Sequence, residues 1–254
     1  MDQAAIADLI RKATWYHGWE IVPGVHTPGW AKLEPRGHLT GMGIEPDLKG
    51  LRAIDIGTYD GPLAFALEAR GADVVAADIQ DPDRTGFNTA KAILGSRVTY
   101  LRSSVYDLSA NDVGRFDVIV FSGVYYHLKY PIMAFEELGR LSHSATKLYV
   151  EGECLIDYAE TLDGSPAPVP EWARSDVPVC LNYPGIYKGT SNWNVPNLAC
   201  LKGWLACGGF RLESHQFLRD KGSQRVILTA VRAPDPLTHM ADSDDGRLIE
   251  HPFL

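Results

Sequence analysis

The sequence lacks three features, each of which would assign the chain to a particular class of protein. No apolar run reaches the roughly 18 residues that a membrane-spanning helix needs, so we expect no association with a membrane. The four cysteines show no CxxC spacing, which predicts reduced thiols and no metal site. The N-terminal stretch has no basic segment followed by an apolar one, so we expect no secretory signal and a cytoplasmic location.

Clusters of basic residues are also absent. The 24 Lys and Arg residues are outnumbered by 32 Asp and Glu residues, for a net charge of −8. Proteins that bind nucleic acids draw much of their affinity from a basic face that neutralises phosphates. The charge therefore disfavours a large RNA or DNA substrate and favours a small molecule, with a basic patch assembled by folding as the alternative.

The chain does contain a regular alternation of short apolar runs and segments of helical spacing. Short apolar runs that end at a glycine turn are typical of buried parallel strands. We expect strands at 51–56, 72–78, 97–101, 116–123 and 146–152, helices at 3–13, 61–71, 87–94, 131–142 and 198–210, and late strands at 211–218 and 223–233. Right-handed crossovers make this a doubly wound α/β fold, with a seven-stranded, mostly parallel, Rossmann-like sheet.

We expect a single domain over 1–254, because chains of this length often build one core. Its expected parts are an N-terminal aromatic cap segment (1–45), a cofactor-binding half (46–155), a substrate lid (156–200), C-terminal strands (201–233) and a tail (234–254). The lid is inferred because 156–197 has little periodicity and is long for a loop inside a compact domain. The polar, acidic tail is expected to be flexible or loosely docked.

The most informative motif is the strand-turn-helix sequence Asp55-Ile-Gly-Thr-Tyr-Asp-Gly61. Gly57 and Gly61 let the backbone bend tightly and let a ligand come close. Open α/β sheets bind ligands beyond the carboxyl ends of their strands, and Asp78 ends the next strand, where a carboxylate can accept both ribose hydroxyl hydrogens. The competing interpretation is that the two glycines only shape a tight turn.

Two kinds of cofactor fit a glycine turn with a ribose-binding acid. A dinucleotide needs a G-x-G-x-x-G turn for its pyrophosphate, but Tyr59 and Asp60 stand in that place. Asp55 and Asp60 instead suit the sulfonium and ammonium groups of S-adenosylmethionine, so a dinucleotide oxidoreductase is disfavoured. Further cofactor contacts are expected from Thr58, Ile79, Ser104, Val105, Ser122 and Gly123.

Six motifs match those of a known family: IDIGTYDG, FDVIVFSGVYYHLKYP, KLYVEGE, PGIYKGTSNWNVPN, CGGF and QRVILTAVRA. From about residue 20 to residue 233 the chain resembles the tRNA wobble-uridine carboxymethyl transferase family and its shorter methyltransferase relatives. The first motif is shared by all class I methyltransferases, whereas GVxYHxxxP, within 123–131, is more specific. The resemblance implies a class I methyltransferase fold.

The resemblance also bears on which cofactor is used. The family's cofactor can be carboxy-S-adenosylmethionine, whose extra carboxylate is held by a Lys, a Tyr and an Arg. The Tyr matches Tyr126 and the Arg matches Arg225, whereas the Lys matches His17. Because a neutral histidine supplies no fixed charge, we expect ordinary S-adenosylmethionine, with the carboxylated form as the alternative.

Candidate catalytic residues follow the fourth and fifth expected strands. Methyl transfer is an in-line displacement in which positioning supplies much of the rate, and a base is needed only if the acceptor must lose a proton early. His127 suits the base, Tyr126 a contact at the methyl-donor end, and Glu151 a contact with an acceptor hydroxyl or amine. Their structural alternatives are a hydrogen bond to the next helix, aromatic packing and a solvated charge, respectively.

Substrate contacts are expected from the cap segment, the lid and the last strand, namely from Trp15, Tyr16, His17, Trp30, Asn192, Trp193, Asn197 and Arg225. Arg225 on a buried strand needs a partner, which a ligand or an internal carboxylate equally provides. The predicted function is methyl transfer to an oxygen or nitrogen of a small molecule. The alternatives are a tRNA-uridine modifier and a non-catalytic cofactor-binding protein on the same fold.

Overall fold

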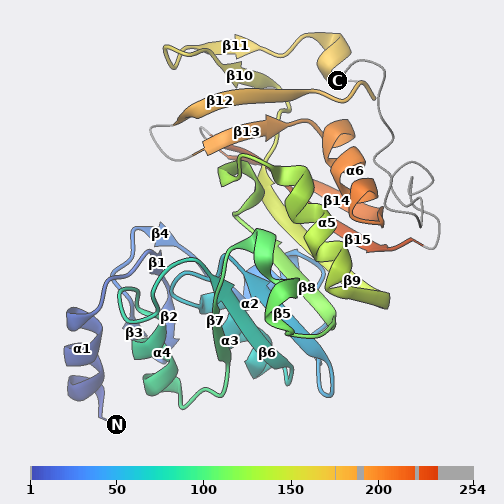
Figure 1. Cartoon of the computed structure of the whole chain (residues 1–254). Coiled ribbons are helices and arrows are strands. Elements are labelled where there is room, and N and C mark those ends of the chain that lie inside the picture. Colours follow the sequence, from blue (N-terminus) through green and yellow to red (C-terminus); the bar gives the residue numbers. More distant parts are fainter. Residues whose placement is uncertain (1, 175, 188–191, 221–222, 234–254) are drawn as a thin grey trace.

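A seven-stranded sheet lies at the centre of the computed structural model, which describes residues 2–174, 176–187, 192–220 and 223–233 (Figure 1). The strands run in the order β14-β15-β9-β8-β5-β6-β7. Their bounds are β5 Arg52–Ile56, β6 Asp73–Asp78, β7 Thr99–Arg102, β8 Phe116–Ser122, β9 Ser142–Glu153, β14 Phe210–Asp220 and β15 Ser223–Arg232. The five strands β5 to β9 are parallel to one another, whereas β15 is antiparallel to both of its neighbours, β9 and β14. The predicted fold class is confirmed.

Helices cover both faces of this sheet. The helices are α1 Gln3–Lys12, α2 Pro35–Gly41, α3 Pro62–Ala69, α4 Phe87–Leu94, α5 Pro131–Arg140 and α6 Leu198–Cys207. Successive side chains of a strand point to opposite faces. Accordingly, Phe121 of β8 packs in an apolar cluster with α5 and α6, and Val120 in a second cluster with α1 to α4. Each face of the sheet therefore has its own buried core.

The N-terminal cap segment, expected at 1–45, contains regular structure for which we predicted no strand. It contains four short strands, β1 His17–Gly18, β2 Glu20–Val22, β3 Val25–His26 and β4 Ala31–Lys32, followed by α2. Strands of two or three residues are too short for a two-residue period to be recognised. Helix α2 begins at Pro35, a favoured first helical residue, and Glu34 accepts hydrogen bonds from the N–H groups of Arg36 and Gly37.

The segment between β9 and α6 also has more regular structure than we expected. Two antiparallel pairs, β10 Tyr158–Glu160 with β11 Pro166–Pro168 and β12 Cys180–Tyr187 with β13 Asn192–Pro196, lie together above α5 and α6 in Figure 1. The register shifts between Asn182 and Tyr187, which breaks the alternation that would reveal a strand. A small apolar cluster that includes Val169 and Tyr183 gives this insertion its own core. The expected tail at 234–254 lies outside the described residues.

One prediction concerns the packing of β9. A methyl group on Gly152 would lie 2.6 Å from the ring of the fully buried Tyr125, so Gly152→Ala should lower the free energy of unfolding by about 1–3 kcal/mol. Gly203 lies in α6 with nothing within 4 Å of the same position, so Gly203→Ala should raise it by about 0.5–1 kcal/mol. Urea denaturation measures both variants, and equal effects would contradict the packing described.

Candidate active site

The turn after β5 is built on three residues with left-handed backbone. Gly57, Tyr59 and Gly61 have φ angles of +80°, +49° and +89°. A Cβ on Gly57 would lie 2.3 Å from Cγ2 of Val124, and one on Gly61 would lie 2.7 Å from the Phe87 ring. Both glycines are therefore required by packing as well as by backbone conformation, and their role in shaping the turn holds beside any role toward a ligand.

Asp78, at the carboxyl end of β6, is joined directly to this turn. Its Oδ2 accepts a hydrogen bond of 2.8 Å from the N–H of Tyr59, whose positive φ needs such support. Its Oδ1 accepts one of 2.9 Å from the N–H of Gln80, and a carboxylate has lone pairs for further donors. The adjacent Ile79 is 64% exposed. A carboxylate beside an exposed apolar side chain suits a ribose and an attached aromatic base.

Asp55 supplies a second carboxylate beneath the turn. It is buried, and the hydroxyl of Thr58 donates to its Oδ2 at 2.7 Å. Burial raises the pKa of Asp55 to about 6, against the opposing effect of the Thr58 hydrogen bond. A positive charge nearby favours the ionised form of a buried carboxyl group. Asp55 therefore suits a ligand with a cationic group.

Asp60 has a different role from the one we expected. Its fully buried carboxylate accepts hydrogen bonds from the N–H groups of Tyr16 and His17, at 3.2 and 2.9 Å, and also contacts Nδ1 of His17. These partners belong to the chain itself, so Asp60 attaches the N-terminal segment to the turn and is not placed as a ligand for the cofactor. Nδ1 of His17 contacts the same carboxylate, and a substrate contact by this residue stays a prediction.

The aromatic residues of the N-terminal segment divide into two groups. Trp15 is buried, and its Nε1–H donates to the carbonyl oxygen of Ile10 at 2.8 Å, so it belongs to the core and not to a substrate surface. The Tyr16 ring centroid lies 5.0 Å from that of Trp30 and 5.3 Å from that of Tyr59. Trp30 is 74% exposed. Tyr16 and Trp30 therefore form an aromatic wall beside the turn.

A buried charged cluster connects β9 and β15. The Nε and Nη2 atoms of Arg225 donate to the two carboxylate oxygens of Glu151 at 2.5 and 2.9 Å, and Nη1 donates to Oε1 of Glu153 at 3.1 Å. Nη2 also donates to the hydroxyl of Tyr126 at 3.2 Å, and the cation lies 5.1 Å from the centre of that ring. The partner that the sequence requires for Arg225 is therefore an internal carboxylate.

These contacts set the protonation states of the cluster. Burial acts to raise the pKa of Glu151, but the hydrogen bonds and charge of Arg225 outweigh it and hold that pKa below its ordinary value. Burial raises the pKa of Tyr126 to about 12, although Arg225 opposes the shift. Glu151 is thus an ionised acceptor, and Tyr126 keeps its proton. Because both oxygens of Glu151 are engaged, we assign it to positioning and no longer to acceptor binding.

His38 belongs to the site although the sequence did not point to it. It lies on α2, and its Nε2 is 3.2 Å from the hydroxyl oxygen of Ser122 at the end of β8. That hydroxyl donates to Oε2 of Glu151 at 3.1 Å. Burial lowers the pKa of His38 below its ordinary value. Its hydrogen-bond partner, Ser122, lies far along the chain, so no local pattern marks His38 as part of a site. Pro35 marks only the start of the helix that carries it.

The remaining predicted cofactor and catalytic residues lie in the connections after β7 and β8. Ser104 accepts a hydrogen bond from the N–H of Tyr106 at the start of a short 3-10 helix, and Val105 is buried. Gly123 has a φ of +75° and donates to the carbonyl oxygen of Glu151. His127 ends the 3-10 helix Tyr125–His127, and its ring lies 4.3 Å from that of Tyr126. Of these four residues, Val105 is the one that packs in an apolar core cluster.

The predicted lid residues have unlike surroundings. Asn197 is the N-cap of α6: its Oδ1 accepts from the N–H of Cys200 and its Nδ2 donates to the carbonyl of Ala173. These contacts make it structural, which corrects its prediction as a substrate contact. Trp193 lies against the ammonium of Lys129, 4.6 Å from ring centre to Nζ. Asn192 is buried, and its Oδ1 has no hydrogen-bond partner among the residues that the structure describes.

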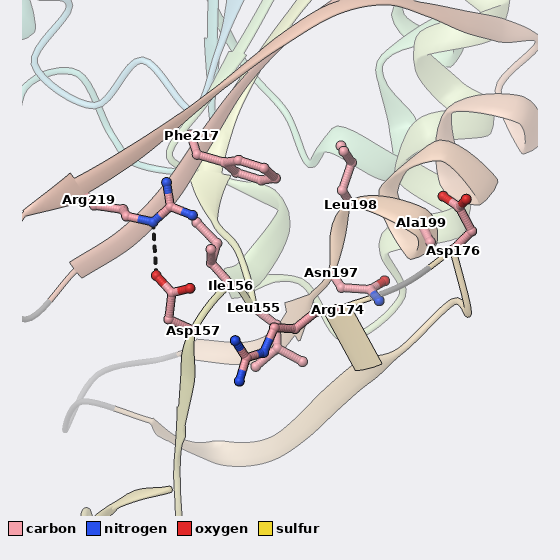
Figure 2. A pocket seen from close by; sticks show the side chains of 10 residues that line it. All are labelled: Leu155, Ile156, Asp157, Arg174, Asp176, Asn197, Leu198, Ala199, Phe217 and Arg219. Carbon is pink, nitrogen blue, oxygen red and sulfur yellow. Dashed lines mark hydrogen bonds and ion pairs between the residues drawn. The ribbon is translucent and has the colours of Figure 1, made fainter. Parts of the chain in front are cut away.

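Figure 2 shows a separate hollow of about 240 Å³ between the insertion, the start of α6 and β14. Its lining includes Phe217, Asn197 and an ion pair of 2.8 Å between Arg219 and Asp157. None of the residues of the β5 turn or the Arg225 cluster lines it. This hollow is therefore separate from the residues that the sequence predicts for the cofactor. In the described part of the chain, no helix is long and apolar enough to span a membrane.

The fold and the turn together define a class I methyltransferase-like architecture, and comparison with known families agrees. Residues 32–174 match the model of a family described as a methyltransferase domain. Since the match spans more than half of the chain, this protein belongs to the methyltransferase domain family. Comparison with curated proteins found no match.

Solved structures with the same fold were also found. The N-terminal domain of EvdMO1 with bound SAH has a TM-score of 0.62 and 18% identity, covering 92% of this chain and 98% of its own. Magnesium protoporphyrin IX methyltransferase from Synechocystis PCC 6803 with bound SAM has a TM-score of 0.54 and 16% identity, covering 78% and 77%. The Burkholderia thailandensis 1,6-didemethyltoxoflavin-N1-methyltransferase, with its substrate and S-adenosylhomocysteine, has a TM-score of 0.52 and 15% identity, covering 91% and 80%. These similarities establish the fold.

A second prediction tests the charged cluster. Arg225→Met leaves Glu151 buried without the guanidinium that binds both of its oxygens, and breaking a buried pair costs about 3–5 kcal/mol. Urea denaturation at pH 7 should show a loss of that size. Arg219→Met, which removes the half-exposed ion pair with Asp157, should cost less than about 1 kcal/mol.

The loss should also depend on pH. In the wild type, folding lowers the pKa of Glu151. Its contribution to stability is therefore fully present above the pKa of the unfolded state and disappears as the pH falls through the lower pKa of the folded state. In Arg225→Met, burial without the cation raises the same pKa, so the buried carboxyl takes up a proton on acidification and the deficit relative to wild type shrinks. A deficit that is equal at pH 7 and pH 5 would contradict the assignment.

Proposed function

We propose that this protein transfers the methyl group of S-adenosylmethionine to an oxygen or nitrogen atom of a small-molecule acceptor. The observation that carries the proposal is the pairing of the glycine turn with Asp78, through the hydrogen bond from Tyr59, above the buried Asp55. The match to the methyltransferase family supports the reaction class. The similar structures support the cofactor, because all three hold SAM or its demethylated product.

The residues at the turn suit S-adenosylmethionine better than a dinucleotide. Asp78 would accept hydrogen bonds from the ribose hydroxyls, Ile79 would cover the adenine, and Asp55 would favour the cationic methionine end. The bulky Tyr59 and the buried Asp60 take the place where a pyrophosphate needs glycine. S-adenosylmethionine supplies a methyl group that is already activated by the sulfonium, so the protein mainly has to position the two reactants.

The proposed acceptor side contains Tyr126, whose hydroxyl group has a defined protonation state. The hydroxyl oxygen of Tyr126 accepts from Arg225, and the pKa of about 12 keeps its own proton available for donation. His127, which the sequence predicts as a base, follows directly on the same 3-10 helix. The wall of Tyr16 and Trp30 offers flat apolar surface. These features favour a small, partly aromatic acceptor, and two of the similar structures act on a porphyrin and a toxoflavin precursor.

Transfer to a tRNA wobble uridine with carboxy-S-adenosylmethionine is the second candidate. It is favoured by the contact between Tyr126 and Arg225, the residues that the resemblance assigns to the extra carboxylate. It is disfavoured because Arg225 is already paired with two glutamates and His17 is engaged by Asp60. Calorimetry with both cofactors and a tRNA mobility shift at low salt distinguish the candidates. Tighter binding of the carboxylated form together with a salt-sensitive shift would favour tRNA.

The third prediction tests the cofactor site. Asp78→Ala removes a charged hydrogen-bond acceptor, worth about 1.5–3 kcal/mol, so binding of S-adenosylhomocysteine should weaken about 10- to 100-fold. Gly57→Val, which adds a strained side chain against Val124, should weaken it at least as much. The matched control is Asp73→Ala, at the opposite end of β6, where the carboxylate is exposed. Unchanged affinity in both site variants, measured by calorimetry, would refute the assignment.

A further inference from the structure

We propose that His38 is the base that takes the proton from a hydroxyl acceptor during methyl transfer. The inference rests on the proposed function and adds to it a catalytic residue and a class of acceptor. The imidazole lies at the carboxyl end of β8, beside the strands whose ends form the cofactor turn. It is joined through a single hydroxyl group to an ionised carboxylate.

The direction of each hydrogen bond follows from the charges. Glu151 is ionised because Arg225 binds both of its oxygens, so its carboxylate only accepts. The hydroxyl hydrogen of Ser122 must therefore point to Oε2 of Glu151, at 3.1 Å. The Ser122 oxygen is then left to accept from His38, at 3.2 Å. His38 consequently carries its proton on Nε2.

This tautomer leaves the lone pair on Nδ1 of His38 available. The Nε2 contact with Ser122 is the only hydrogen bond that the described chain gives this ring. The charged and titratable groups that face the imidazole are Glu151 on β9, Arg225 on β15 and His17 in the N-terminal segment. Burial, together with Arg225 and His17, outweighs Glu151 and lowers the pKa of His38, so the ring is neutral at pH 7 and accepts a proton at Nδ1.

The proton transfer can be written so that every bond is accounted for. The O–H bond of the acceptor breaks as Nδ1 of His38 takes the proton, and an oxygen electron pair forms the bond to the methyl carbon. The bond between that carbon and sulfur breaks with its electrons remaining on sulfur, which leaves S-adenosylhomocysteine, a methyl ether and a protonated His38. The imidazolium donates through Ser122 toward Glu151, whose negative charge stabilises it.

The hydrogen-bond arrangement is tested first, without any acceptor. Nitrogen-15 NMR of the imidazole in the complex with S-adenosylhomocysteine should show the Nε2–H tautomer of His38 and a titration midpoint below 6.5. Ser122→Ala should remove the tautomer preference. His143, whose Nε2 contacts Asp117 on β8 3.0 Å away, provides an internal reference signal that Ser122→Ala should not change. An Nδ1–H tautomer, or a cationic His38 at pH 7, would overturn the proposal.

The catalytic role is tested with a series of substituted phenols of graded acidity. His38→Gln should slow methyl transfer roughly 100- to 10,000-fold with weakly acidic phenols, and much less with phenols that are already ionised at the assay pH. His143→Gln should transfer at the wild-type rate. An equal loss across the series, no loss, or no methylation of any phenol by the wild type would overturn the assignment.

Calorimetry separates this proposal from the one on which it rests. His38→Gln should bind S-adenosylhomocysteine within about a factor of three of wild type, because Asp78 and the turn are intact. If the wild type binds the cofactor product and His38→Gln keeps full activity, only the inference about His38 fails. If the wild type binds neither S-adenosylmethionine nor S-adenosylhomocysteine, the proposed function fails with it.

Discussion

The ion pair between Arg225 and Glu151 is the contact on which the proposed acceptor side of the site depends. Because Arg225 keeps Glu151 ionised in a buried position, the Ser122 hydroxyl has only one way to point, and Ser122 in turn fixes the tautomer of His38. A buried ion pair is a poor source of stability, since desolvation cancels much of the attraction. Here it instead gives direction to hydrogen bonds between β8, β9, β15 and α2, so that groups far apart in the sequence meet with defined protonation.

A second buried carboxylate, Asp60, determines where the N-terminal segment lies. The backbone N–H groups of Tyr16 and His17 bind it, and this contact holds the aromatic wall beside the turn that carries Asp55 and Asp78. The proposed cofactor and acceptor sides are therefore built alike. In each, a buried carboxylate, Asp60 or Glu151, binds a residue that is distant in the sequence. Removing the charge of Asp60 or Glu151 is therefore expected to loosen the residues bound to that carboxylate.

The central fold could be predicted from the sequence because its signals are local. Alternating apolar runs and helical spacing gave β5 to β9 and α3 to α5 with ends close to those observed, and Gly57 and Gly61 marked the turn. The roles of Asp60 and His38 depend on contacts that no local pattern encodes. Asp60 resembled a cofactor acid because it lies in the turn, and His38 follows a glycine in a short helix. Asn197 did carry a local signal, since asparagine before a helix is a favoured N-cap.

The central claim of the proposed function is that the cofactor binds at the turn after β5, in a chain that belongs to the methyltransferase domain family. A crystal structure of the protein with S-adenosylhomocysteine tests that claim most directly. We expect the ribose on Asp78, the adenine against Ile79, and the sulfur end directed toward Ser122 and His38. A ligand bound instead in the hollow between α6 and β14, or bound at the turn with its sulfur directed away from the Arg225 cluster, would contradict the site proposed here.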